Sequence, residues 1–320
     1  MRKILRALVN ITLWACALAL LGLSMAGVIT HPSFYVDNIA QLRLPILIAA
    51  IVFLPFPLML RRKRVASLTA AIIFVTALPV FALCIPDTGA ARAAGDQTQR
   101  IRVVSANVWG ARNLDTTRFE QLVRRENPDV FIVIEKTPAW IKSLKQHLPE
   151  YSTEFEEEIS GGTAMFSKIP IQQIDMRTVL PRHRRFGIRG VITLNGKQLL
   201  LIGSHPPAPS AIKRWQVRNA EMQRLAEDVR AQRNRSQPVV IAGDLNTTPW
   251  SFYFNQLIKS GLHDSEQGLG PQPSWSTRMP LCLVPIDHAL YTDGVAISNR
   301  HLGPNIGSDH LPLTFDISLQ

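Results

Sequence analysis

The sequence predicts an α+β protein preceded by three membrane-spanning helices, and three observations lead to this prediction. Long apolar runs fill most of the first ninety residues. Beyond them, segments typical of strands outnumber segments typical of helices. Several of those strands follow one another with no helix between them. This order favours an α+β or β-sandwich core flanked by helices over a strictly alternating parallel sheet.

The apolar runs cover about residues 7–29, 42–60 and 65–85. Each has roughly the length that a helix needs to cross a hydrocarbon layer of ~30 Å. We therefore expect residues 1–88 to form a membrane anchor of three transmembrane helices. A small, polar linker at 89–100 then leads to a domain at 101–320.

Two of the runs have weaknesses. The second run is short, and Pro45, Pro55 and Pro57 would kink it, which membrane helices tolerate when neighbouring helices satisfy the freed carbonyls. The first run follows a basic segment and could be a cleaved signal peptide. It is long for one, however, and two more apolar runs follow it.

Charge predicts the orientation of the anchor. Arg2, Lys3 and Arg6 precede the first run, and "RRKR" at 61–64 lies between the second and third. The loop "HPSFYVDN" contains neither Lys nor Arg. Because positive residues remain in the cytoplasm, we expect a multi-pass protein of the inner (plasma) membrane. The domain after the third run then lies outside, in the periplasm or the extracellular space.

The net charge of +11 reflects this topology more than a nucleic-acid footprint. Of the 35 basic and 24 acidic residues, 10 basic and 3 acidic lie in residues 1–100, which leaves 25 basic and 21 acidic residues in 101–320, a net of +4. A mildly basic domain suits an anionic substrate without requiring one. The domain holds a single cysteine, Cys282, so it cannot form an internal disulfide.

Regular segments begin directly after the linker. We expect strands at 101–108, 129–135, 163–168, 187–194, 197–205, 238–246, 285–291 and 311–319, and helices at 116–127 and 210–232.

Polar residues mark the ends of these apolar strands. They are Asn107, Glu135, His205, Asp244 with Asn246, Asp287, and the adjacent Asp309 and His310 before the last strand. One polar strand end is ordinary, but six such ends would deliver side chains to one edge of a sheet, where loops form a site.

The composition of this set indicates phosphate chemistry with a hard cation. Oxygen ligands such as Glu135, Asp309 and Asn107, with Asp244 or Asp287 nearby, favour Mg²⁺, Mn²⁺ or Ca²⁺ over zinc. A further carboxylate can deprotonate a water, and a histidine can neutralise developing phosphoryl charge.

Six segments together resemble the endonuclease/exonuclease/phosphatase superfamily: "SANVWG", "VIEKT", "GSHPPAP", "AGDLNTTPW", "PIDHALY" and "GSDHLPL". Their order and spacing match across residues 101–320. The resemblance implies a four-layer α/β/β/α sandwich of the deoxyribonuclease I type. It also implies Mg²⁺ (or Mn²⁺) held by Glu135, with Asn107 and Asp309 close by.

The same resemblance implies roles for the other residues. Asp244 would orient or deprotonate the attacking water, and Asn246 would hydrogen-bond phosphate. His310 would contact the scissile phosphate, held in orientation by Asp287, and His205 would be the second histidine at the phosphate.

The chain departs from one subgroup of that superfamily. Apurinic/apyrimidinic endonucleases usually carry Tyr at the position of His205 and an acid at the position of Trp109. The chain is therefore closer to the deoxyribonuclease I and sphingomyelinase branches. No stripe of interleaved aromatic and basic residues stands out, so the sequence does not demonstrate DNA binding.

Two further residues are candidate substrate contacts. Trp109 could stack on a base or sugar, or pack in the wall of the site. Arg189, in "RHRRFGIR" at 182–189, could grip an anionic substrate or belong to a solvated loop.

The leading hypothesis is a membrane-anchored, divalent-metal-dependent phosphoesterase that hydrolyses a phosphodiester of nucleic acid or phospholipid by in-line attack of an activated water. The alternative is a phosphomonoesterase acting on a lipid or sugar phosphate. A catalytically dead binding protein is the remote alternative. Beyond a phosphate-ester substrate and the lipid bilayer, the sequence indicates no partner.

Overall fold

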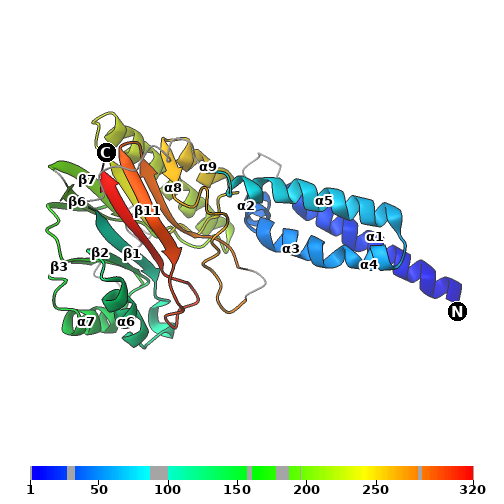
Figure 1. Cartoon of the computed structure of the whole chain (residues 1–320), viewed down its shortest axis with the longest axis horizontal. Coiled ribbons are helices and arrows are strands. Elements are labelled where there is room, and N and C mark those ends of the chain that lie inside the picture. The colour runs from blue at the N-terminus through cyan, green and yellow to red at the C-terminus, as the bar shows by residue number, and fades with distance from the viewer. Residues whose placement is uncertain are drawn as a thin grey trace.

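The computed structural model has an elongated helical part and an α+β part (Figure 1). It describes residues 2–26, 33–86, 100–156, 161–177, 187–194, 196–279 and 283–319. Most of the predicted linker, residues 182–186 of the basic segment, and Cys282 lie outside this part of the chain.

Two six-stranded sheets form the centre of the α+β part. The first has the order β11-β12-β1-β2-β4-β3 and the second the order β5-β6-β7-β8-β10-β9. The strands of the first sheet are β1 Ile101–Asn107, β2 Val130–Ile134, β3 Thr153–Glu156, β4 Thr163–Ser167, β11 Val295–Leu302 and β12 Leu313–Leu319. Those of the second are β5 Gln173–Arg177, β6 Gly187–Leu194, β7 Lys197–Gly203, β8 Val239–Asp244, β9 Leu262–Asp264 and β10 Asp287–Thr292.

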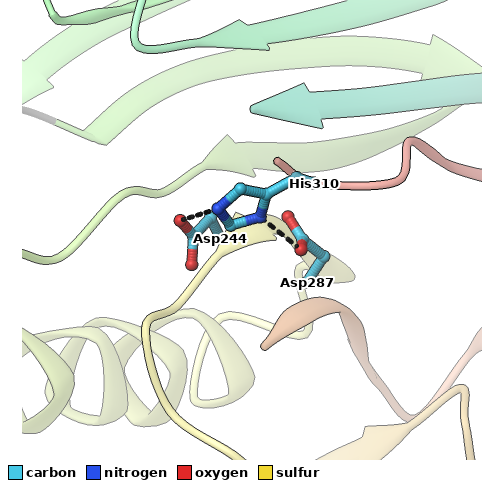
Figure 2. A group of neighbouring side chains, drawn as sticks. All are labelled: Asp244, Asp287 and His310. Atoms are coloured by element: carbon cyan, nitrogen blue, oxygen red, sulfur yellow. Dashed lines mark hydrogen bonds and ion pairs between the residues drawn. The ribbon is translucent and has the colours of Figure 1, made fainter. Parts of the chain in front are cut away.

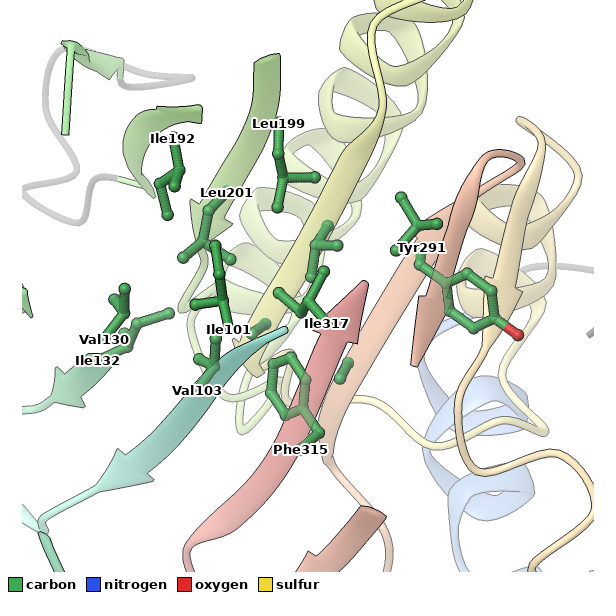
Figure 3. Packing of buried hydrophobic residues seen from close by; sticks show 14 of the residues in the cluster. Ile101, Val103, Val130, Ile132, Ile192, Leu199, Leu201, Tyr291, Phe315 and Ile317 are labelled. Carbon is green, nitrogen blue, oxygen red and sulfur yellow. The ribbon is translucent and has the colours of Figure 1, made fainter. Parts of the chain in front are cut away.

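The main core lies between the two sheets (Figure 3). Side chains of opposite sheets meet there, among them Val103 and Phe315 from the first and Leu201 from the second. Because side chains alternate along a strand, Val104 of β1 points to the other face of its sheet. Each sheet is therefore apolar on both faces, and its outer face needs a cover.

Helices cover the outer faces. On the first sheet, α6 (Thr117–Glu126) and α7 (Pro138–His147) bury Phe119 and Trp140 against Phe131. On the second, α8 (Ile212–Arg233) and α9 (Phe252–Ile258) bury Met222 and Phe254. The order helix, sheet, sheet, helix confirms the predicted four-layer sandwich.

The N-terminal part consists of α1 (Arg2–Ala26), α2 (Phe34–Gln41), α3 (Arg43–Phe53), α4 (Pro55–Met59) and α5 (Lys63–Ala82). By length and composition, α1 and α5 could each cross a membrane. The second predicted span is less regular. It becomes a third candidate only if α2 and residues 43–59 count as one span, and these are bent by 61° relative to each other.

Exposed apolar side chains are concentrated in these helices. Of the large apolar side chains that are exposed in the described residues, all but Leu114, Ile212, Leu269 and Met279 lie between residues 4 and 85. A surface of this kind is unfavourable in water and suits lipid.

The helical part is joined to the sandwich by a buried polar contact at Asp37 of α2. Its Oδ2 accepts hydrogen bonds from Trp215 Nε1 (2.9 Å) and from Arg218 on α8, and its Oδ1 accepts one from Ser251 Oγ (2.7 Å). Arg218 is fully buried and Asp37 is 2% exposed. Breaking such a pair would leave one charge buried without its partner, so the contact fixes α2 firmly.

An apolar contact accompanies it. Trp250 packs against Leu47, Ala77, Val80 and Leu83 of the helical part, and its Nε1 donates to the carbonyl of Pro79 at 3.3 Å. The carbonyl of Leu83 accepts from the backbone of Gly268 (2.7 Å) and Gly270 (3.0 Å). The helices and the sandwich thus share one continuous interface.

The carboxylate of Asp316 on β12 links three strands of the first sheet. Its carboxylate accepts from Arg102 Nε (2.7 Å) and Nη2 (3.1 Å) on β1 and from Asn299 Nδ2 (2.8 Å) on β11. We expect Asp316→Asn to lower the free energy of unfolding by about 1–3 kcal/mol, because the buried side chain would then present a neutral amide to the partly exposed Arg102 guanidinium. Urea unfolding of the detergent-solubilised protein measures this. Asp293→Asn, at a carboxylate 70% exposed, is the matched control and should change stability little.

Candidate active site

Strand register brings the predicted polar residues together. β1 and β2 run parallel with Asn107 opposite Ile134, so Glu135 follows directly beside Asn107. In the second sheet, β7 and β8 run parallel with Gly203 opposite Ala242, and Asp244 pairs with Asp287 of β10. His205 and Asp244 each lie two residues past a matched pair, so they emerge at the same edge.

Gly243 allows β7 and β8 to approach closely at this edge. Its φ is +146°, and a Cβ atom there would lie 2.1 Å from the carbonyl oxygen of Ser204. Any side chain would therefore push the end of β8 away from the end of β7. The glycine keeps Asp244 next to His205.

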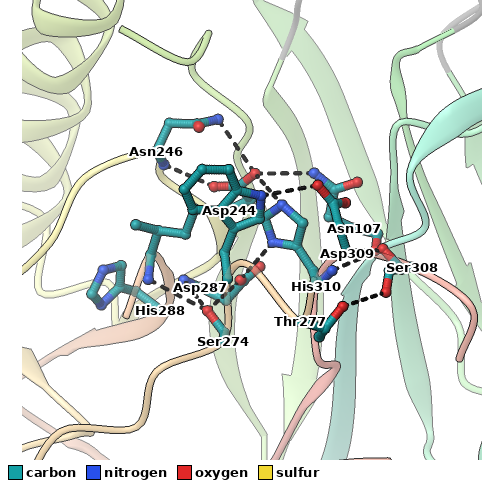
Figure 4. A network of polar contacts seen from close by, with 12 residues as sticks. Asn107, Asp244, Asn246, Ser274, Thr277, Asp287, His288, Ser308, Asp309 and His310 are labelled. Carbon is teal, nitrogen blue, oxygen red and sulfur yellow. Dashed lines mark hydrogen bonds and ion pairs between the residues drawn. The ribbon is translucent and has the colours of Figure 1, made fainter. Parts of the chain in front are cut away.

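Asp244 is the centre of the group (Figure 4). Its Oδ2 accepts from Asn107 Nδ2 at 3.0 Å and from Asn246 Nδ2 at 3.3 Å, and its Oδ1 accepts from the Asn246 backbone N–H at 2.9 Å. The carboxylate is 1% exposed. Burial raises the pKa of Asp244 to about 7, helped by the charge of Asp287 and opposed by His310 and these hydrogen bonds.

His310 lies between two carboxylates (Figure 2). Its Nδ1 lies 2.9 Å from Asp287 Oδ2 and its Nε2 lies 3.7 Å from Asp244 Oδ2. Burial disfavours the charged ring, but the charges of Asp287 and Asp244 outweigh it and raise the pKa of His310 to about 9. The ring is therefore an imidazolium near neutral pH, with Nε2–H directed toward Asp244.

Two imidazoles converge on one oxygen atom. His205 Nε2 lies 3.6 Å from Asp244 Oδ2, and His310 Nε2 lies 3.7 Å from the same atom. His205 Nε2 is also 3.7 Å from Glu135 Oε1. A carboxylate of near-neutral pKa can take a proton from water, and imidazole rings beside it can stabilise an oxyanion when they present an N–H group.

Glu135, Asn107 and Asp309 carry side-chain oxygens of the kind that bind a hard divalent cation. The side chain of Glu135 is 29% exposed, which leaves it open to an ion and its waters. Asp309 Oδ2 accepts from Trp275 Nε1 at 3.0 Å, whereas its Oδ1 is buried with no hydrogen-bond partner. A buried carboxylate oxygen without a donor is a free ligand position, and the donor set is all oxygen.

A second arrangement of ligand-type atoms, Asp244, Asp287 and His310, lies within 4.8 Å. A metal ion is not needed there, because the Asp287 and Asp244 charges raise the pKa of His310 and its ring supplies positive charge to both carboxylates.

Three residues of the site have a left-handed backbone. They are Trp109 (φ 64°), Glu135 (φ 58°) and Asn246 (φ 48°), each one or two residues past the end of a strand. Residues other than glycine rarely adopt this conformation, and it carries a cost that the surrounding structure must offset. Here it turns each side chain at the end of its strand toward the site.

The two candidate substrate contacts have different surroundings. The ring of Trp109 has the guanidinium groups of Arg112 and Arg278 at 5.5 and 5.2 Å from its centroid, and its backbone N–H donates to Asn107 Oδ1 at 3.0 Å. It therefore lies beside the metal-side residues. Arg189 instead forms a buried ion pair with Asp228 on α8. The structure does not bring Arg189 into the contacts described for this group.

Several residues that hydrogen-bond to this group were not predicted from the sequence. Ser274 Oγ donates to Asp287 Oδ2 at 2.5 Å, and Ser308 Oγ donates to the carbonyl of Asn107 at 2.7 Å while accepting from His310 N–H at 3.1 Å. Arg218 Nη1 donates to the carbonyl of Asn246 at 3.2 Å. Ser308 stands beside the conspicuous Asp-His pair, but nothing in the sequence marks Ser274 or Arg218.

The family model described as "Endonuclease/Exonuclease/phosphatase family" matches residues 104–310. The chain belongs to this family. The match spans every residue of the group around Asp244. Members of the endonuclease/exonuclease/phosphatase family hydrolyse phosphoric esters, which agrees with the acid–base arrangement of the site. No curated protein matches the chain.

Solved structures of the family share the fold of this member. A D. rerio TDP2 humanized by 14 mutations is 18% identical, with 68% of this chain and 99% of that chain covered and a TM-score of 0.58. The human Nocturnin catalytic domain with bound sulfate is 17% identical, covering 69% and 95% with a TM-score of 0.58. A Bacteroides thetaiotaomicron mannosyl-6-phosphatase is 16% identical, covering 68% and 100% with a TM-score of 0.56. At these identities the likeness shows the fold alone.

The pKa values of this family member's site predict a bell-shaped pH profile. We expect kcat/KM for phosphoric-ester hydrolysis to rise as Asp244 loses its proton near pH 7 and to fall as His310 loses its proton near pH 9. In Asp287→Asn the alkaline limb should move to lower pH, because His310 loses the anion that raises its pKa. An alkaline limb unchanged in this variant would contradict the pairing of His310 with Asp287.

Proposed function

We propose that the protein is a membrane-anchored, Mg²⁺- or Mn²⁺-dependent phosphoesterase that hydrolyses a phosphodiester by in-line attack of water. The observation that carries this proposal is the convergence of His205 Nε2 and His310 Nε2 within 3.7 Å of Asp244 Oδ2. This arrangement provides a base and two oxyanion contacts within the space of one phosphate group.

Asp244 is the proposed base. Its pKa of about 7 matches the pH at which it must accept a proton from water, and Asn107 fixes its orientation from the opposite sheet. Asn246 directs its amide nitrogen to Pro206 O at 2.9 Å and to Asp244 Oδ2 at 3.3 Å. These contacts support a role for Asn246 in positioning Asp244, in addition to the predicted phosphate contact.

His310 and His205 would bind the phosphoryl oxygens. Asp287 holds His310 through Nδ1, which leaves Nε2–H as the donor to developing negative charge. Glu135, Asn107 and Asp309 would hold the divalent cation, which when bound neutralises charge on the phosphate and the leaving oxygen.

Trp109 supports a diester over a monoester. Its partly exposed ring lies beside Asn107 and is flanked by the guanidinium groups of Arg112 and Arg278, which together suit a flat or anionic group next to the scissile phosphate. A phosphodiester has two ester groups, so one can lie against Trp109 while the other leaves, whereas a monoester has only its leaving group to place there. The substrate would be a nucleic acid or a phospholipid.

The helical part supports membrane anchoring. α1 and α5 are long and apolar enough to cross a bilayer, and both expose large apolar side chains along their length. Together with the positive residues at 2–6 and 61–64, this favours a multi-pass inner-membrane protein with the sandwich outside.

The catalytic roles are testable in the full-length protein in detergent, with bis(p-nitrophenyl) phosphate and p-nitrophenyl phosphate as substrates. We expect Mg²⁺-dependent turnover with the diester preferred. Asp244→Asn should lose ~10³-fold or more in kcat, since proton transfer and water positioning disappear together. Glu135→Gln should lose ~10²-fold or more and require higher Mg²⁺ concentrations.

Glu227→Gln, at an exposed position of α8, is the matched control for Glu135→Gln and should retain full activity. Near-normal turnover by Asp244→Asn would rule out its role as the base. Preference for the monoester would overturn the diester assignment while leaving phosphoester hydrolysis intact.

Topology is tested separately. A C-terminal alkaline phosphatase fusion should be active in a bacterial host, because the enzyme requires export. A C-terminal green fluorescent protein fusion should remain dark for the same reason. The reverse pair of results would place the sandwich in the cytoplasm.

A further inference from the structure

A second cluster of side chains that could bind a metal lies on the opposite side of β10 from Asp287 and His310. Asp264, Glu266 and His288 offer one atom each, and these atoms lie within 4.8 Å of one another. His288 follows Asp287 in β10, so its ring points to the opposite side of the strand from Asp287 and His310 (Figure 4). The catalytic roles described above use none of the three residues.

All three atoms are buried acceptors without a donor. Asp264 Oδ2, Glu266 Oε2 and His288 Nδ1 have no hydrogen-bond partner, and Glu266 and His288 are 0% exposed. A single buried acceptor left in this state costs about 1–3 kcal/mol. Three that face one another would add mutual repulsion, which either a bound cation or a proton on Glu266 would relieve.

The protonation of His288 follows from its other contact. Nε2 lies 2.9 Å from the carbonyl oxygen of Thr247, which can only accept, so Nε2 carries the hydrogen. Burial lowers the pKa of His288, which keeps the ring neutral. Nδ1 therefore presents a lone pair to the cluster, the form in which histidine binds a metal.

The two carboxylates are held in the same way. Asp264 Oδ1 accepts from the backbone N–H of Glu266 at 2.9 Å, and Glu266 Oε1 accepts from the backbone N–H of Gln272. Each carboxylate thus has one oxygen fixed by the backbone and the other directed into the cluster. Outer contacts of this kind orient metal ligands in proteins.

Arg300 is the nearby positive side chain, but its nitrogens are engaged elsewhere. Nε donates to Ser265 Oγ at 2.9 Å, Nη1 to Gln272 Oε1, and Nη2 to the carbonyl of Asp287 at 3.3 Å. Arg300 moderates the charge of the cluster without satisfying the three lone pairs.

We propose that Asp264, Glu266 and His288 form a second, structural metal site for a divalent cation of the Zn²⁺ or Mn²⁺ class. One imidazole nitrogen and two carboxylate oxygens suit these ions better than Mg²⁺, which prefers oxygen and water. Entry is available because Asp264 also lines a cavity of about 600 Å³ between the helical part and the sandwich.

A metal ion at Asp264, Glu266 and His288 would stabilise the neighbouring residues of the catalytic group. His288 is adjacent to Asp287, and Thr247, whose carbonyl orients His288, is adjacent to Asn246. A bound ion would therefore restrain the strand that carries Asp287 and the loop that holds Asp244. Its effect would appear as stability and metal content, independent of the proposed reaction.

The test uses full-length protein carrying Glu135→Gln, which weakens the catalytic cation site. After treatment with a chelator and desalting, Zn²⁺ and Mn²⁺ are titrated by calorimetry, and the thermal midpoint is followed. We expect one equivalent of metal to bind and the midpoint to rise by several degrees. Adding Glu266→Gln should weaken binding at least 10-fold and abolish the rise, whereas adding Glu227→Gln should change neither.

Folding of the Glu266→Gln variant is checked by circular dichroism and by its midpoint without metal, which should match or exceed that of the Glu135→Gln parent. Equal metal binding in the two double variants would overturn the proposal. So would no metal binding by the Glu135→Gln parent, since a proton shared by Glu266 would then satisfy the cluster.

Discussion

The arrangement of the candidate site depends on the burial of the Asp244 carboxylate. A buried carboxylate is costly unless hydrogen bonds and opposite charge compensate it. Asn107 supplies a hydrogen bond from the first sheet, Asn246 supplies two from the loop after β8, and His310 supplies the positive charge. Because these donors come from both sheets, Asp244 is satisfied only when the sandwich is closed. The closure that builds the core also sets the pKa of Asp244.

The fold was largely predictable because its central strands are buried on both faces. Continuous apolar runs such as β2 and β8 stand out in the sequence, and polar residues mark where they end. The elements that the sequence did not reveal carry weaker patterns. β11 is exposed at several positions, and α7 has only Trp140, Ile141 and Leu144 as buried residues. The second candidate span is interrupted at Leu54, ahead of Pro55, as its prolines indicated, and the chain also bends at Leu42 between α2 and α3.

Within the site, the sequence identified residues at strand ends and missed those that come from loops. Register turns strand ends into neighbours, so Asn107, Asp244 and Asp287 could be grouped from their positions at the ends of apolar runs. Ser274 reaches Asp287 from a loop, and no local pattern encodes that approach. Arg189 was predicted as a substrate contact but is paired elsewhere. It lies in a basic segment that suggests an anionic ligand, yet its partner is Asp228, 39 positions further along the chain.

The loop between β8 and α9 belongs to the catalytic group and to the helical part at once. Asn246 stands at one end, its carbonyl held by Arg218, and Trp250 and Ser251 stand at the other, against the helices and Asp37. Cutting the chain at residue 100 would therefore leave Arg218 without its carboxylate and Trp250 without its apolar cover. Helices α2, α3 and α5 therefore help to hold the loop that carries Asn246, so the N-terminal helices contribute to the structure of the candidate site.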